Sequence, residues 1–158
     1  MTMLYGACKF RARNAAGAAI LPLLLLSDPC RAADASPWDK GQQSAVRLIA
    51  VSALQSGSNP TFRAGIEIRL HKGWKTYWRY PGDSGVPPRF SFVRSENVKA
   101  VAIKWPAPHR FSDEGGQSIG YKEHVVFPLG VEPLDPRRPV VLRLDLDYAV
   151  CEKLCVPA

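Results

Sequence analysis

The chain has 158 residues, a hydrophobic fraction of 46% and a formal net charge of +7. This length leaves room for one domain and for little else. The basic residues are scattered, with Arg137-Arg138 as the one basic doublet, so the charge pattern does not favour a nucleic-acid-binding protein.

The first 35 residues differ in kind from the rest of the chain. A basic start is followed by an apolar run from Ala15 to Leu26, and small residues before position 36 offer cleavage sites. This order is typical of a secretory signal peptide. The run is interrupted by Pro22, and a membrane span needs about 20 apolar residues. Residues 1–35 are therefore predicted to be a cleaved signal rather than an anchor.

The chain after the signal is predicted to be all-β. Residues 36–43 are expected to form a loose leader, and residues 44–158 the folded domain. Runs of alternating hydrophobic residues are separated by stretches rich in Gly, Pro, Asp and Ser, which is the pattern of short strands joined by turns. The expected strands cover residues 45–53, 62–70, 74–80, 98–105, 125–131 and 140–150. Without a long helix to make a parallel crossover, they indicate an antiparallel sandwich of the immunoglobulin type.

The last of these strands, 140–150, leads directly to two cysteines. Its even-numbered residues are apolar and are expected to face the core, whereas Asp145 and Asp147 face solvent. Continued alternation places Cys151 on the solvent side. The sequence stops at Ala158, so we expect this strand to lie at a sheet edge or in a sandwich that lacks its last strand.

An earlier strand, in the segment GWKTYWRY, is rich in aromatic residues. Trp74, Trp78 and Tyr80 share one face of this strand and are expected to fill the core, as large aromatic side chains mostly do. Tyr77 and Arg79 then point the other way, where they are expected to border an interface.

Removal of the signal leaves two cysteines, Cys151 and Cys155, in a compartment where disulfides persist. They can bond if the turn between them brings their Cα atoms within about 7 Å. A structural staple of this size constrains the unfolded chain by only about 2 kcal/mol. A zinc site would need two further ligands, and the histidines show no ligand-like spacing. The third alternative is a reversible disulfide at an exposed strand end, open to an attacking thiolate.

Four segments occur in an order and spacing that resemble a known family. They are GWKTYWRYPGDSGVPPRF (73–90), SENVKAVAIKWPAPHRF (95–111), SIGYKEHVVFPLGV (118–131) and YAVCEKLCVP (148–157). Together they resemble the N-terminal periplasmic domain of the DsbD/ScsB family of thiol:disulfide interchange proteins, over about residues 44–158. The cysteine spacing is closer to that of the ScsB type.

The resemblance implies an immunoglobulin-like domain in the periplasm with a redox-active Cys151–Cys155 pair and with neither cofactor nor metal. It implies that a thioredoxin-like donor reduces this pair, which then reduces thioredoxin-fold acceptor proteins. Cys151, predicted to lie on the exposed side of its strand, is expected to be the sulfur that the partner attacks.

Six further residues are expected to support this site. Asp113 and Glu114 fall where the family has a cap loop over the disulfide, and Phe111 is expected to supply the shielding aromatic ring. Near the pair, Lys153 favours a thiolate and Glu152 opposes it. The sixth residue is Tyr148, which precedes the cysteine motif.

The family normally continues with a final strand and with transmembrane and thioredoxin-like parts. We therefore expect a form shortened after the cysteine motif, which is either a stand-alone relay, the product of a split or frameshifted gene, or a partial coding sequence. A separate membrane electron-transfer subunit is one partner that such a form would use. Two alternatives stay open on the sequence. One is a secreted β-sandwich binding module with a structural disulfide, and the other is a non-functional truncated fragment.

Overall fold

The computed structural model describes residues 35–54, 61–83, 85–113 and 116–158. Within these ranges all regular structure is β-strand, and all strand pairings are antiparallel. The same ranges contain no helix with the length and hydrophobicity needed to cross a membrane. Residues 1–34 of the predicted signal peptide lie outside the described residues.

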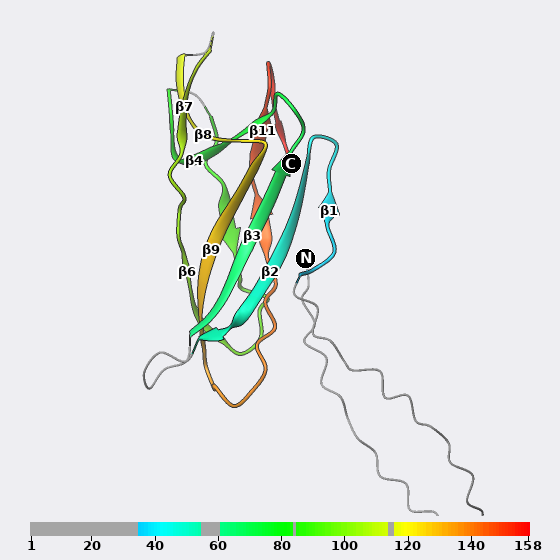
Figure 1. Cartoon of the computed structure of the whole chain (residues 1–158), viewed down its shortest axis with the longest axis vertical. Helices are drawn as coiled ribbons and strands as arrows, with labels where there is room; N and C mark the ends of the chain where they lie inside the picture. Colours follow the sequence, from blue (N-terminus) through cyan, green and yellow to red (C-terminus); the bar gives the residue numbers. More distant parts are fainter. Residues whose placement is uncertain (1–34, 55–60, 84, 114–115) are drawn as a thin grey trace, which may run out of the picture.

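Two five-stranded sheets form the molecule (Figure 1). The first has the order β1 (Asp39–Lys40), β2 (Ser44–Leu54), β3 (Thr61–Leu70), β9 (His124–Pro133) and β6 (Val98–Ile103). The second has the order β12 (Cys155–Pro157), β11 (Ala149–Cys151), β4 (Lys75–Gly82), β8 (Gly116–Lys122) and β7 (His109–Asp113). A short ribbon pairs β10 (Asp145–Asp147) with β5 (Arg89–Ser91). The predicted all-β immunoglobulin-like sandwich is confirmed.

The two sheets enclose one hydrophobic core. In β3, the residues predicted to face inward are buried or half-buried, and Ile66 and Ile68 are 0% exposed. Phe127 of β9 lies among three aromatic rings, with centroid distances of 5.2 to 5.4 Å. These rings belong to Phe90, Trp105 and Tyr121. Because Tyr121 comes from the second sheet, this cluster fixes one sheet against the other.

The stretch predicted as one strand over 140–150 is interrupted, because β10 ends at Asp147 and β11 begins at Ala149. The prediction that Cys151 faces solvent is wrong, since Cys151 is 2% exposed. Both faces of β11 are covered. One face belongs to the core, and the other packs with Tyr77 in a small buried cluster that contains Ala149 and Cys151.

The aromatic residues in and just before β4 also depart from simple alternation. Trp74 and Trp78 pack against the core, as predicted, but Tyr80 is 66% exposed and Tyr77 only 2%. The expectations for both tyrosines are therefore wrong. Tyr80 follows an irregularity in β4, whose pairing with β8 shifts register between Tyr77 and Gly82. Tyr77 is buried because Ala149 and Cys151 cover its face of the strand.

Residues 36–43, expected to be a loose leader, lie against the first sheet. Ser36 N–H donates to the Leu48 carbonyl at 2.8 Å, and Leu48 N–H donates to Ser36 Oγ at 3.0 Å. The guanidinium groups of Arg47 and Arg69 lie over the Trp38 ring at 4.3 and 4.8 Å. Hydrogen bonds and cation–π contacts thus hold this segment in place.

The same face carries an ion-pair network around Glu67, which is 5% exposed. Its carboxylate accepts hydrogen bonds from Arg47 Nε at 2.6 Å and Arg69 Nε at 3.1 Å, and it lies 2.9 Å from His124 Nε2. Burial acts to raise the pKa of Glu67. The hydrogen bonds from Arg47, His124 and Arg69 and the charge of Arg47 outweigh burial and hold this pKa below its ordinary value.

We expect the Glu67→Gln variant to change how stability depends on pH. A carboxyl group with a lowered folded-state pKa stabilises the fold above its unfolded-state pKa, and this contribution is lost as the pH falls through the folded value. The variant should be less stable than the wild type at neutral pH and should lose less stability on acidification below about pH 5. Urea unfolding at several pH values measures both effects. An equal pH dependence in the two proteins would contradict the prediction.

Candidate functional site

Cys151 and Cys155 are joined by a disulfide at the edge of the second sheet. Their Cα atoms are 4.1 Å apart, and the two residues are partners in the antiparallel pairing of β11 with β12. The turn 152–154 connects these strands. The disulfide therefore links the two sides of a short β-hairpin directly beside its turn.

The two cysteines differ strongly in exposure. Cys151 is 2% exposed, on a strand flanked by β4 and β12. Cys155 is exposed and belongs to β12, the outermost strand of its sheet. A thiolate of another protein therefore has access to Cys155 and not to Cys151, which reverses the expectation from strand alternation.

Tyr77 of β4 contacts both sulfur atoms. Its hydroxyl donates a hydrogen bond to Cys151 Sγ at 2.9 Å and lies 3.3 Å from Cys155 Sγ. The side chain is 2% exposed, so the phenol covers the inner sulfur. The analysis of the sequence did not assign Tyr77 to the site.

The turn after β4 holds the Tyr77 ring in place. Gly85 has a φ of +131°, and a Cβ atom there would lie 2.4 Å from the ring. This combination of positive φ and close approach requires glycine. Asp83 ties the turn to β8, because its backbone N–H donates to the Gln117 carbonyl at 2.8 Å and its carboxylate accepts from Gln117 N–H at 2.9 Å.

Neighbouring residues of β4 connect the hairpin to the rest of the sheet. Thr76 Oγ1 donates to the Ala149 carbonyl at 2.9 Å. Lys75 is the pairing partner of Cys151 and is 7% exposed, and its ammonium donates to Ser118 Oγ at 3.1 Å. These buried contacts fix β11, and with it the inner sulfur, relative to β4 and β8.

Phe111 and Asp113, which were expected at or beside a cap loop over the disulfide, lie on β7, at the edge of the second sheet opposite to β12. Phe111 is on β7, three strands from β11, or about 14 Å at the usual strand spacing. Its ring lies 4.6 Å from the ammonium of Lys122 and 5.9 Å from that of Lys75. Asp113 pairs with Gly116 at the end of the β7–β8 hairpin, and Glu114 lies outside the described residues.

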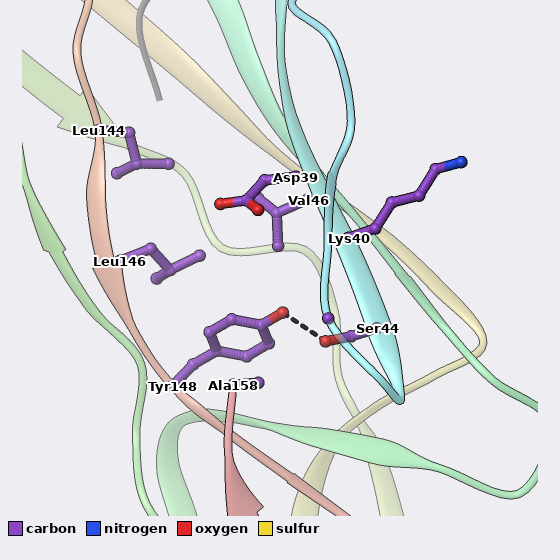
Figure 2. A pocket seen from close by; sticks show the side chains of 9 residues that line it. Asp39, Lys40, Ser44, Val46, Leu144, Leu146, Tyr148 and Ala158 are labelled. Carbon is purple, nitrogen blue, oxygen red and sulfur yellow. Dashed lines mark hydrogen bonds between the residues drawn. The ribbon is translucent and has the colours of Figure 1, made fainter.

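The three supporting residues near the motif lie in different places. Glu152 and Lys153 are exposed on the turn between the cysteines. Tyr148 lines a cavity of about 170 Å³, where its hydroxyl lies 2.7 Å from Ser44 Oγ (Figure 2). Burial raises the pKa of Tyr148. Its hydroxyl therefore connects the segment before β11 to β2 of the first sheet.

The sequence matches the family model described as the N-terminal part of the thiol:disulfide interchange protein DsbD, over residues 44–158. The chain belongs to this family. A solved structure, the N-terminal periplasmic domain of ScsB from Proteus mirabilis, is similar to it, with 28% sequence identity and a TM-score of 0.63. This match covers 79% of the chain and 48% of the ScsB structure, so the chain spans about half the length of that protein domain. A search of curated proteins gives no match.

As a member of the DsbD N-terminal family, the chain carries the disulfide-bonded pair Cys151–Cys155 within the matched residues. The matched region contains both strands of the hairpin and the tyrosine that contacts the sulfurs. The domain therefore presents to solvent one sulfur of a disulfide whose other sulfur is buried and hydrogen-bonded.

Proposed function

We propose that the domain passes electrons between thioredoxin-fold proteins in the periplasm through the Cys151–Cys155 pair. The observation that carries this proposal is the asymmetry of the disulfide. Cys155 is open to attack, whereas Cys151 is 2% exposed and accepts a hydrogen bond from Tyr77. Exchange needs one sulfur that a thiolate can reach and one that can leave with its negative charge stabilised.

Reduction of the pair proceeds by two substitutions at sulfur. A donor thiolate attacks Cys155 Sγ, a bond forms between these two sulfurs, and Cys151 leaves as a thiolate. The second donor thiolate then attacks the donor sulfur of the mixed disulfide, and Cys155 leaves as a thiolate. The donor ends as a disulfide, the domain has gained two electrons, and its thiolates take up protons from water according to their pKa values.

Oxidation of the pair runs through the same atoms in reverse. The exposed Cys155 attacks the disulfide of an acceptor, and Cys151 then attacks Cys155 Sγ to release the reduced acceptor. In both directions Tyr77 stabilises the negative charge on Cys151, because its hydroxyl already donates to that sulfur at 2.9 Å and hydrogen bonds to charged groups are the stronger ones.

The charges on the turn complete the proposed site. Glu152 and Lys153 are both exposed beside Cys155, so a partner meets one charge of each sign there. We assign the donor role to a thioredoxin-like protein or a membrane electron-transfer subunit that carries such a domain, and the acceptor role to periplasmic thioredoxin-fold proteins. Residues 1–35 act in this proposal as the export signal.

The reduction potential of Cys151–Cys155 tests the proposal. The purified protein is equilibrated in graded thiol/disulfide buffers, and free thiols are counted by alkylation and mass spectrometry. We expect a potential between about −120 and −270 mV, the range of exchange proteins. A potential below about −300 mV would mark a structural disulfide, and would favour the alternative of a binding module.

A further inference from the structure

We propose that a groove beside β12 binds an extended, uncharged segment next to the reactive cysteine of the partner. The inference rests on the proposed function and adds the surface that selects the partner. The groove has a volume of about 420 Å³, and Cys155 forms part of its wall. Val156 and Pro157 of β12 line it together with Val86 and Pro87.

The geometry of attack on Cys155 Sγ requires the partner's thiolate to approach from the side of this groove. In a substitution at sulfur the incoming thiolate approaches in line with the bond that breaks, from the side opposite the leaving sulfur. Cys151, the leaving residue, lies on β11, with β4 and Tyr77 behind it. The approach to Cys155 is therefore from beyond β12, and the residues that flank the attacking cysteine must pass along the outer side of this strand.

The backbone of β12 is suited to receive such a segment. Leu154 O accepts from Glu152 N–H at 3.4 Å, and Ala158 N–H donates to the Tyr148 carbonyl at 3.0 Å. Because bonding alternates along an antiparallel strand, the backbone groups of Cys155 point away from β11. Proline has no N–H to donate, so Pro157 limits added pairing to the neighbourhood of Cys155. Pairing of a partner strand there aligns its cysteine with the sulfur.

The chemistry of the groove identifies the kind of segment. Val86 is 52% exposed although it is apolar, and it lines the groove together with Val156 and Pro157. Arg89 and Asp147, one charge of each sign, also line the groove. A mostly apolar lining with no excess of either of these charges favours an uncharged segment with small or apolar side chains over a charged one.

The test compares two substrates and two matched variants. Val86→Glu places a charge in the groove, and Val93→Glu places the same charge at a valine that is 90% exposed and lies outside the residues that line it. The disulfide of each protein is reduced either by reduced thioredoxin or by dithiothreitol, which is too small to need the groove. We expect Val86→Glu to slow thioredoxin about tenfold or more, as loss of a central interface contact does. Its reaction with dithiothreitol, and both reactions of Val93→Glu, should stay near the wild-type rates.

The outcomes separate the inference from the proposed function. If wild-type protein reacts with dithiothreitol but not with thioredoxin, the proposed function is wrong. If thioredoxin reduces the wild type and Val86→Glu at equal rates, the groove is not the docking surface. A Val86→Lys variant gives the sign of any electrostatic effect. Slowing by both charges supports an apolar contact, whereas acceleration by one of them overturns it.

Discussion

Replacement of the two cysteines one at a time should have opposite consequences for exchange. We expect Cys155→Ser to abolish reaction with oxidised thioredoxin-fold proteins, because the remaining thiol, on Cys151, is 2% exposed. Cys151→Ser keeps the exposed thiol and should form a mixed disulfide with the partner. The partner for this test is a single-cysteine variant activated as its disulfide with 5-thio-2-nitrobenzoate, which leaves as the thiolate when Cys155 attacks. The adduct should persist, because neither protein then keeps the second thiol that would resolve it.

The two variants are compared by mass spectrometry after incubation with the activated single-cysteine thioredoxin-fold protein and quenching by alkylation. The wild type, which completes the exchange, is the control for transient adducts. Alkylation of the reduced variants alone gives an independent measure of access to each thiol, and we expect Cys151→Ser to react much faster than Cys155→Ser. A stable adduct through Cys151 would mean that the inner sulfur is the one that partners reach.

Tyr77→Phe should slow exchange about tenfold to a hundredfold. The change removes the hydroxyl that donates to Cys151 Sγ and keeps the ring that covers it. A hydrogen bond to a charged group contributes about 1.5–3 kcal/mol, and each 1.4 kcal/mol corresponds to about tenfold in rate. Because the negative charge on Cys151 develops during the reaction, the loss appears in the rate. Stopped-flow reduction by thioredoxin measures it.

Tyr121→Phe is the matched control for this variant. Tyr121 is also buried, but it belongs to the main core, and its hydroxyl donates to the Pro106 carbonyl at 2.9 Å. Both variants should lose about 1 kcal/mol of stability from a buried hydrogen bond. Only Tyr77→Phe should slow exchange. Equal rates for the two variants would show that Tyr77 has a packing role alone.

Five of the six expected strands could be predicted from the sequence, whereas the regularly alternating stretch 140–150 is interrupted in the structure. The strand predicted over 62–70 is β3 at Thr61–Leu70, and the one over 98–105 is β6 at Val98–Ile103. β7 and β8 were not predicted. Glu123 has a φ of +61°, which separates β8 from β9, and no property of a glutamate signals this left-handed conformation in advance.

The cysteine pair could be predicted, but its environment could not. Alternation assumes that one face of a strand meets the core and the other meets water. At Cys151 the second face meets Tyr77, which reaches it through the pairing of Lys75 with Cys151 between strands 76 positions apart in sequence. Register between such distant strands depends on the whole sheet. The exposure of each sulfur, which decides the direction of attack, therefore emerged from the structure.

The β-hairpin around the disulfide limits how much the structure must change each time the disulfide is reduced and formed again. The covalent ring spans a sequence separation of four residues, and the same residues are held together by the backbone pairing of β11 with β12 and of β11 with β4. Opening the ring therefore releases little chain entropy. We therefore expect the oxidised and reduced forms to keep the same scaffold, with the rearrangement largely confined to two side chains. Such a low reorganisation cost suits the proposed role of a carrier that turns over repeatedly without passing through a partly unfolded state.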